Sequence, residues 1–387
     1  MRIRLFTIFL IVTNSIFAQI NIDSLQSIVS SNVADTIKIK NLLLLTEYCQ
    51  DNSKNKCVEY LNQAYTIAKK SDNKKYISRL SNQLGRHYYY LGDYKRALKN
   101  FLETLEANES LTDEVGIASC LNNIGSIYIG QEDYGKALEY HLKALNLRQE
   151  NFKKGLGDGN DIAMSYGNIG QAYFYLNNLS KAMEYYNKSI KISENTGNKE
   201  RVALMLNNIG SIYGQQKKYE NALLYYTKSL QIQRQLNDKQ NMAMTLNNIA
   251  SVYLEKLDYT NAIDLFNKGL ALSKQNGYLD DLKTSYEGLN SCYLGLKDFK
   301  NAYTYLTLFH SIKDSIYNSE NSDQLNEMLT KFDTNSKEQS IKLLQKDQQI
   351  HNYFRNSIIV GFILICILAI LLFSINKMKR RAKQNVK

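Results

Sequence analysis

The stretch LNNIGSIY at residues 121–128 decides the fold, because it recurs along the chain. Related stretches are GNIGQAYF at 167–174, LNNIGSIY at 206–213 and LNNIASVY at 246–253. Its tyrosine recurs in steps of 40, 40, 45, 40, 40 and 40 residues, at Tyr48, Tyr88, Tyr128, Tyr173, Tyr213, Tyr253 and Tyr293. The longer step holds the loop-like insert NFKKGLGDGN. Self-similarity at this period predicts an array of stacked helical units.

Two further markers keep the same register. A small residue stands at Cys57, Ala97, Ala137, Ala182, Ala222, Ala262 and Ala302, where two helices would approach closely. Four residues later comes Leu61, Phe101, His141, Tyr186, Tyr226, Phe266 or Leu306. Within a unit, Leu121, Ile124 and Tyr128 fall on one face of a helix. Each unit is therefore expected to be a pair of helices.

Capping residues predict where these helices begin and end. The second helix of a pair should begin at Asp93, Asp133, Asn178, Asp258 or Asp298, whose side chains accept from free backbone N–H groups. Lys218 occupies this position in one unit and should make a poorer start. Gly197 and Gly277 should end second helices in the left-handed conformation.

The series Leu84-Gly85-Tyr88-Ala97-Phe101 and Ile124-Gly125-Tyr128-Ala137 resemble the signature of the tetratricopeptide repeat. The resemblance covers about residues 37–312 and implies an all-α solenoid of about seven helical hairpins. The period of 40 exceeds the usual value of about 34, and the chain has no Pro. Both departures suggest longer helices, as in the long-repeat type, and TLNNIASVY also looks like the long repeats of kinesin light chains.

The two ends of the chain have the character of membrane-targeting segments. Residues 1–18 place two arginines before an apolar run that ends at Ala18, the pattern of a signal peptide. Residues 357–375 contain no charge and are long enough to span a bilayer. A basic tail, 376–387, follows and predicts a cytoplasmic end. We expect a single-pass protein of a bacterial inner membrane, with its N-terminal part in the periplasm.

The net charge of +11 does not indicate nucleic-acid binding. Eight of the basic residues lie at the ends: Arg2, Arg4, Lys377, Lys379, Arg380, Arg381, Lys383 and Lys387. Subtracting them from +11 leaves +3 for the rest of the chain. Charge at the ends orients a protein in a membrane and does not form a DNA-binding face.

Between the repeats and the apolar segment, residues 317–356 are polar and charged. A partial apolar stripe, with Leu325, Leu329 and Phe332, predicts a helical stalk with weak coiled-coil character. A single solvated helix is an equal alternative, because no three clean heptads occur. The expected domains are therefore the signal peptide 1–18, the solenoid 19–316, the stalk 317–356, the membrane helix 357–375 and the tail 376–387.

The sequence contains no pattern typical of an enzyme. The motifs for phosphate, nucleophile and zinc sites are absent, and no Cys or His cluster occurs. His141 replaces an aromatic residue at a repeat position, which predicts a core role. The loop GLGDGN at 155–160 follows a helix and is interpreted as a flexible insert. Cys49 and Cys57 should be buried thiols, although a disulfide between them is conceivable. We expect no enzyme, no cofactor and no metal.

Asparagine is unusually frequent within the first helices, although it disfavours helices by up to about 0.7 kcal/mol relative to Ala. In the tetratricopeptide family the position two before the glycine lines the concave groove, where Asn can bind an extended peptide. By that resemblance Asn123, Asn168, Asn208 and Asn248 are candidate groove residues. The doubled asparagines and the polar stripe beside them add Asn122, Ser126, Gln171, Asn207, Ser211, Asn247 and Ser251. The alternative is that these amides bridge neighbouring helices. Arg86 is the one basic residue in line with the groove that could bind an acidic peptide tail.

The order of parts resembles the extracytoplasmic half of bacterial sensors that contain these repeats and continue into a histidine kinase or regulator. Because only the short tail 376–387 follows the apolar segment, we expect no such output domain in this chain. We expect a protein- or peptide-binding receptor or adaptor that signals through a partner, such as a membrane kinase or regulator. The alternatives are a scaffold for an envelope protein complex and the remnant of a sensor that lost its output domain.

Overall fold

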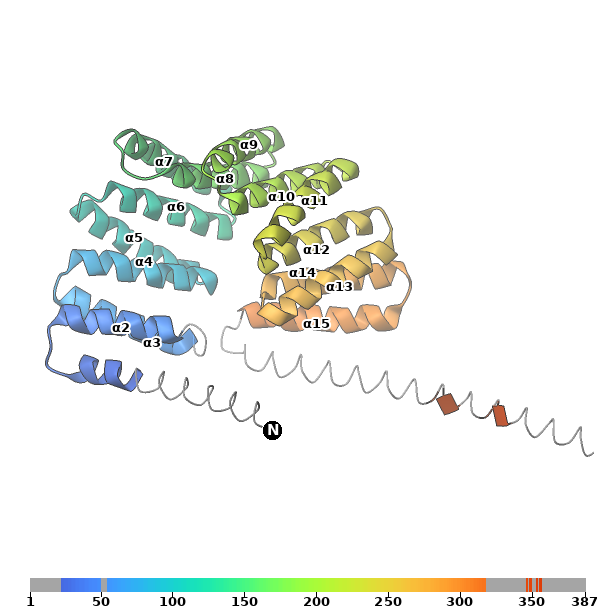
Figure 1. Ribbon diagram of the computed structural model, residues 1–387, viewed down its shortest axis with the longest axis horizontal. Helices are drawn as coiled ribbons and strands as arrows, with labels where there is room; N and C mark the ends of the chain where they lie inside the picture. The colour runs from blue at the N-terminus through green and yellow to red at the C-terminus, as the bar shows by residue number, and fades with distance from the viewer. Residues whose placement is uncertain are drawn as a thin grey trace, which may run out of the picture. The chain divides into compact units, whose positions relative to one another are not determined.

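The computed structural model describes residues 22–49 and 54–317 and a few positions between 346 and 356. The chain divides into two compact units, Met1–Ser319 and Glu320–Lys387, and the first contains the repeats. Its described helices from α2 to α15 form seven antiparallel-type pairs stacked in chain order (Figure 1). A further helical stretch, residues 22–30, precedes α2. The prediction of an all-α solenoid of about seven helical hairpins is confirmed.

The two helices of each pair follow directly on one another. The first helices are α2 (Asp35–Cys49), α4 (Lys74–Tyr90), α6 (Glu114–Gly130), α8 (Gly159–Tyr175), α10 (Lys199–Gln215), α12 (Lys239–Glu255) and α14 (Leu279–Gly295). The second helices are α3 (Lys54–Lys70), α5 (Tyr94–Ser110), α7 (Tyr134–Lys153), α9 (Leu179–Asn195), α11 (Tyr219–Leu236), α13 (Tyr259–Asn276) and α15 (Phe299–Tyr317). The insert lengthens α7 to 20 residues and adds a loop before α8.

Helix starts follow the predicted capping residues. The Asp258 carboxylate accepts from the backbone N–H of Asn261, and Asp298 accepts from that of Asn301. Asp93, Asp133 and Asn178 cap α5, α7 and α9 in the same way. Lys218 has similar backbone angles but makes no side-chain cap bond, as predicted. The first helices use the same device at Asn73, Asp113, Asp158, Asn198 and Asp238.

The links between helices require a left-handed residue. Gly197 and Gly277 have φ of 74°, as predicted for helix ends. Several links, however, place a residue with a side chain in this region, including Leu257 with φ of 59°. The Leu257 side chain is 68% exposed, so the link has room for it. The left-handed backbone conformation is nevertheless strained for a residue with a Cβ. Only the glycine positions could be identified from the sequence.

The core is built on one large side chain in each second helix. Phe101 lies against Gly85, where an added Cβ would come within 2.8 Å of the ring, and Tyr226 lies against Gly210 in the same way. These large residues also pack against the next first helix: Tyr226 shares a buried cluster with Ile249 of α12. The small residues Ala97, Ala137, Ala182, Ala222 and Ala262 are fully buried, as predicted. Stacking of successive pairs therefore forms the core.

The last pair shows what the next helix contributes. Phe266 of α13 is 1% exposed, whereas Leu306, at the same repeat position in α15, is 38% exposed. Phe299 and Tyr303 on the same helix are 68% and 73% exposed. Among the described helices, none covers this face of α15, so its apolar residues remain at the surface.

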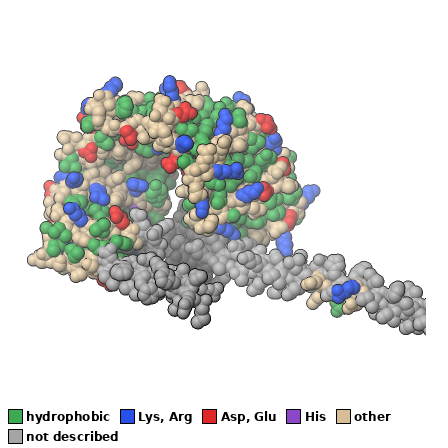
Figure 2. All heavy atoms as spheres, in the orientation of Figure 1, with side chains coloured by type: hydrophobic (Ala, Val, Ile, Leu, Met, Phe, Trp, Pro, Cys, Tyr) green, Lys and Arg blue, Asp and Glu red, His purple; other side chains and the backbone are tan. Residues whose placement is uncertain are grey.

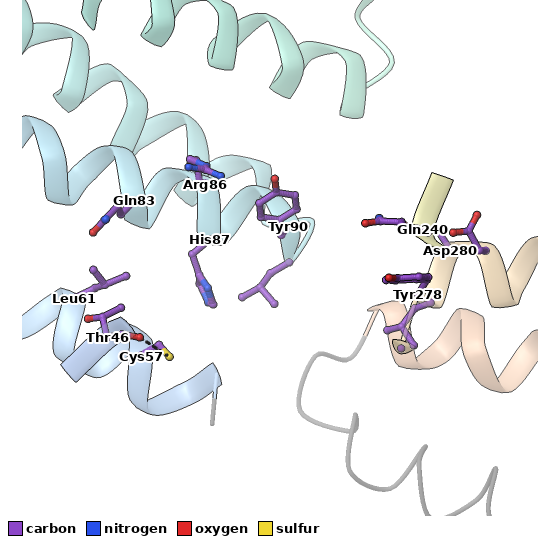
Figure 3. Close-up of a pocket in the computed structure, with 14 residues that line it drawn as sticks. Thr46, Cys57, Leu61, Gln83, Arg86, His87, Tyr90, Gln240, Tyr278 and Asp280 are labelled. Carbon is purple, nitrogen blue, oxygen red and sulfur yellow. Dashed lines mark hydrogen bonds between the residues drawn. The ribbon is translucent and has the colours of Figure 1, made fainter. Parts of the chain in front are cut away.

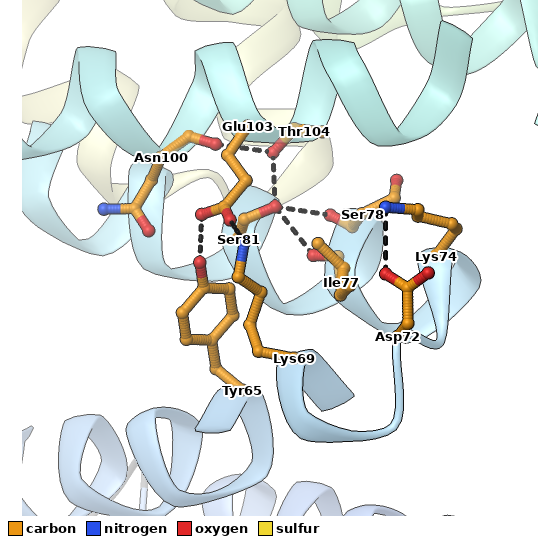
Figure 4. Close-up of polar contacts among 10 residues, drawn as sticks. All are labelled: Tyr65, Lys69, Asp72, Lys74, Ile77, Ser78, Ser81, Asn100, Glu103 and Thr104. Atoms are coloured by element: carbon orange, nitrogen blue, oxygen red, sulfur yellow. Dashed lines mark hydrogen bonds and ion pairs between the residues drawn. The ribbon is translucent and has the colours of Figure 1, made fainter. Parts of the chain in front are cut away.

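Polar contacts accompany the apolar core. Between α4 and α5, the hydroxyls of Ser81 and Thr104 lie 2.8 Å apart in the buried interior (Figure 4). On the surface, Glu103 of α5 accepts from both Tyr65 and Lys69 of α3, which joins successive second helices (Figure 4). Burial and the nearby Glu103 carboxylate raise the pKa of Tyr65, so its hydroxyl stays protonated and donates.

The predicted membrane and targeting segments lie outside the described residues. These are the signal peptide 1–18, almost all of the stalk 317–356, the apolar segment 357–375 and the tail 376–387. Within the part of the chain that the structure describes, no helix is long and apolar enough to cross a membrane. The boundaries and the membrane topology stay predictions.

The missing cap at Lys218 predicts a stabilising substitution. Lys218→Asp should raise the free energy of unfolding by about 1 kcal/mol, because an aspartate here can accept from the free N–H groups of α11. Asp258→Ala, at the matched position of α13, should lower it by about the same amount. Urea denaturation of the full chain measures both. Equal stabilities for Lys218→Asp and the wild type, with Asp258→Ala destabilised, would contradict the interpretation.

Candidate functional site

The predicted asparagine residues lie on successive first helices that contact one another, α6, α8, α10 and α12. The first residue of each pair is buried: Asn122, Asn207 and Asn247 are 5%, 2% and 1% exposed. The second residue is half-buried. We call the surface formed by Asn123, Asn168, Asn208 and Asn248 the asparagine face.

The asparagine side chains form a row of hydrogen bonds between repeats, which we call the ladder, and each bond is a rung that follows the same pattern. The second asparagine of a repeat donates from Nδ2 to Oδ1 of the first asparagine of the preceding repeat. Asn168 donates to Asn122 at 2.8 Å, and Asn248 donates to Asn207 at 3.2 Å. Asn123 donates at 3.2 Å to Asn82 of α4, which the sequence analysis did not include. The ladder therefore ties neighbouring first helices together.

One rung is missing, for a reason visible in the sequence. Gly167 occupies the position where Asn122 stands one repeat earlier, so the amide of Asn208 has no side chain to donate to. Asn208 is half-buried and has no hydrogen-bond partner among the described residues. An asparagine at 167 would crowd Met205, whose Cε lies 3.1 Å from the Cβ position. Asn208 is thus the candidate on the asparagine face with a free amide.

The last rung is replaced by a different contact. Gly288 stands where a donating asparagine would be, and Ser285 of α14 donates to Oδ1 of Asn247 at 2.9 Å instead. The Nδ2 of Asn247 donates to the backbone carbonyl of Asp281 at 3.0 Å. Asn247 is therefore fully used inside the fold.

The hydroxyl candidates lie one turn further along the same helices. Ser126, Ser211 and Ser251 are half-buried, and each donates to the backbone carbonyl of the asparagine four residues before it, at 3.2, 3.3 and 2.9 Å. Gln171 holds the equivalent position in α8 and, like Asn208, has no hydrogen-bond partner in residues 22–49 and 54–317. No observation tests whether these candidates bind a ligand, and the groove stays a prediction.

His141 has the predicted core position. It is 1% exposed, and its ring lies against Gly125, as the aromatic rings do in other repeats. Its Nδ1 lies 3.2 Å from Oδ1 of Asn122, which only accepts, so the ring nitrogen donates. Burial, with a contribution from Arg148, lowers the pKa of His141 to about 4. The imidazole is therefore neutral at physiological pH.

A cavity of about 630 Å³ lies between the first and last repeats, and we call it the α4–α14 cavity. On one wall, Gln83, Arg86, His87 and Tyr90 come from α4 (Figure 3). On the other wall, Gln240 comes from α12, and Tyr278 and Asp280 come from the start of α14 (Figure 3). A smaller cavity of about 150 Å³ joins Arg86 to the asparagine face and is lined by Arg86, Tyr89, Tyr90, Phe101, Asn123 and Ser126.

The two walls of the α4–α14 cavity differ in charge. Arg86 is exposed on the α4 wall, while Asp280 and Asp281 lie on the α14 wall. Burial, and to a lesser degree Asp280, raises the pKa of Asp281 to about 6. The side-chain oxygen of Gln83 is buried without a hydrogen-bond partner. These groups can bind polar or charged parts of a ligand.

The structure shows no feature of a metal or nucleophile site in its described part. Within residues 22–49 and 54–317, no group of His, Cys, Asp and Glu is placed to hold a metal ion. Burial raises the pKa of Cys120 to about 12 and that of Cys292 to about 11, which suits inert core thiols. On the face seen in Figure 2, basic side chains are interspersed with acidic ones.

Sequence reasoning identified Arg86 but not the opposite wall. Tyr278, Asp280 and Asp281 precede or begin α14 and line the same cavity as residues of α4, which lies far from them along the chain. The one local signal was the adjacent acidic pair in the first turn of a helix. Such a pair is common at helix starts and indicates no ligand by itself.

The repeats match the tetratricopeptide repeat family at residues 76–150, 116–195 and 201–275. Because these matches together cover half of the chain, the protein belongs to the tetratricopeptide repeat family. No curated protein matches the chain.

Solved structures share the fold at low identity. The apo form of RapI is 16% identical with a TM-score of 0.58, and the match covers 72% of this chain and 98% of that one. A Rap protein complexed with competence and sporulation factor is 17% identical with a TM-score of 0.57, covering 76% and 80%. Aspartyl phosphate phosphatase F from Bacillus subtilis is 16% identical with a TM-score of 0.54, covering 76% and 79%. These likenesses show the fold alone.

The ladder can be tested with a matched pair of substitutions. Asn168→Ala removes a rung, whereas Asn208→Ala removes an amide without a partner at the same repeat position. The gain in helix propensity is the same in both, so Asn168→Ala should be less stable than Asn208→Ala by about 1 kcal/mol. Denaturant unfolding of the full chain gives the difference. Equal stabilities would show that the rung contributes nothing.

The buried histidine predicts a pH dependence of stability. His141 has a pKa of about 4 in the folded chain and near 6.5 when exposed, so between these values only the unfolded chain takes up the proton. Stability should fall as the pH decreases from about 6.5 to 4, by about 3 kcal/mol at most. His141→Phe, which restores the aromatic residue of Phe101 and Phe266, should lack this component. The difference between the two chemical-denaturation profiles measures it, and parallel profiles would contradict the assignment.

Proposed function

We propose that this chain is a membrane-anchored receptor or adaptor that binds a protein or peptide and acts in signalling through a partner. The observation that carries the proposal is the free amide of Asn208 on a face otherwise used for helix-to-helix bonds, together with a separate cavity of mixed charge. Asparagine amides can donate to and accept from a peptide backbone at once. Repeats of this type are generally non-catalytic, which agrees with a binding role.

The structural neighbours support a peptide as the ligand class. One Rap protein was solved complexed with competence and sporulation factor, and the Rap conjugation gene regulator of the plasmid pLS20 was solved with the Phr* peptide. The second is 11% identical with a TM-score of 0.57. Because this chain shares their fold, we infer that its helices also hold a peptide.

The location of the protein is proposed from the sequence. The signal-peptide pattern at 1–18, the uncharged segment 357–375 and the basic tail 376–387 together favour a single-pass protein of a bacterial inner membrane, with the repeats in the periplasm. A signal would then pass through a separate membrane kinase or regulator.

A scaffold for an envelope protein complex is the second candidate. The ladder favours it, because Asn168, Asn248 and Asn123 use their amides to join neighbouring helices and not to face a ligand. In that role the array would hold its partner constitutively, by surfaces other than the asparagine face.

Photo-crosslinking of the full-length protein in its native membrane tests the two candidates. Asn208 and Gln171 are predicted groove residues without partners of their own, so Asn208→Ala/Gln171→Ala should reduce partner capture at least tenfold without changing the helical content. Asn187→Ala, an exposed asparagine on the second helix α9, is the matched control and should leave capture unchanged. Capture of envelope components that survives the double variant would contradict the receptor and favour the scaffold.

A further inference from the structure

We propose that the α4–α14 cavity binds a short peptide by both of its free ends, the carboxylate at Arg86 and the ammonium group at Asp280 and Asp281. This inference rests on the proposed peptide-binding function and names the chemical class of the ligand, a short peptide with free termini. It also assigns a site separate from the asparagine ladder.

The two charged walls face each other across one cavity. Arg86 comes from α4, and Asp280 and Asp281 come from the first turn of α14 (Figure 3). Neither Arg86 nor the two aspartates appears among the ion pairs of the described residues. The ion pairs of Lys143 with Glu139, Lys188 with Glu184 and Lys268 with Asp264 each join neighbouring turns of one helix. The charges of Arg86, Asp280 and Asp281 are not used in this way. A guanidinium is suited to a carboxylate, because its planar N–H groups match the two oxygens.

Burial of the Asp281 carboxylate on the α14 wall lowers the stability of the folded chain. Burial disfavours the charged form of Asp281, which raises its pKa to about 6. At neutral pH the carboxylate is nonetheless ionised, and the folded chain bears the penalty without a cation beside it in the described residues. An ammonium group bound at this wall would relieve that penalty. Partly buried charges without a partner occur more often at binding sites than at purely structural positions.

Uncharged groups between the two poles suit a peptide backbone. The buried oxygen of Gln83 has no donor, and a backbone N–H could supply one. Tyr90, 76% exposed, and Tyr278 present aromatic surface on opposite walls. The volume of about 630 Å³ lies within the range of small-ligand pockets, so it suits a few residues and not a folded domain.

The site differs from the asparagine face in what it selects. The ladder positions could bind any extended backbone along its length, irrespective of its ends. The α4–α14 cavity instead recognises termini, and it would therefore favour products of peptide cleavage over an internal segment of a protein.

Peptide binding to the full-length chain in detergent micelles tests the inference. The probe is a fluorescent pentapeptide library with free termini, compared with its N-acetylated and its C-amidated forms. The free library should bind at least tenfold more tightly than either blocked form. Arg86→Gln should abolish the preference for a free carboxylate alone, and Asp280→Asn/Asp281→Asn should abolish that for a free amino group alone.

Two matched controls accompany these variants. Arg79→Gln and Glu287→Gln alter exposed residues of α4 and α14 that do not line the cavity, and both should behave as the wild type. Binding that is indifferent to blocked termini but lost in Asn208→Ala/Gln171→Ala would overturn the inference and leave the proposed function standing. Absence of binding by all three libraries, together with partner capture indifferent to the double variant, would overturn both.

Discussion

In the pairs α4–α5, α8–α9 and α10–α11, one large side chain of the second helix lies against a glycine of the first and shares a buried cluster with the helix that follows. The contact is close enough to restrict the residue types: a Cβ on Gly125 would come within 2.7 Å of the His141 ring. Because each large residue is buried by two different helices, no pair is complete alone. The asparagine face and the α4–α14 cavity are both built on helices that this packing positions.

The amide ladder shows how a polar row can be part of a packed array. Its rungs run from half-buried donors to buried acceptors, so the acceptors that water cannot reach are satisfied by the next repeat. Binding and packing are then not exclusive interpretations of the same residues. The rungs give the asparagines of α6, α8 and α12 a structural role, and Asn208, the position without a rung, is the one that we propose for an outside ligand.

Helix starts and buried positions, which depend on residues close in sequence, could be predicted. Contacts between repeats, which depend on how successive helix pairs are stacked, could not. The helix starts at Asp93 and Asp258, the poor start at Lys218 and the buried role of His141 depend on local spacing, and all are observed. Asparagine was correctly located on the first helices, but which amide donates to which depends on the offset between repeats. Asp280 lies far from Arg86 along the chain, and no periodicity indicates that the two line one cavity.

The face of α15 that no described helix covers suggests how repeat arrays of this kind can lengthen during evolution. Leu306 occupies a position that is buried in the preceding pairs, and unlike Phe266, which lies against Gly288 of α14, it has no following helix against it among the described residues. Within the described helices, α15 thus exposes the surface that the preceding second helices pack against the next first helix. Duplication of one 40-residue segment in the gene would extend the array without requiring a new kind of interface. The number of repeats is therefore a property that inheritance can alter one unit at a time, while the packing rule stays the same.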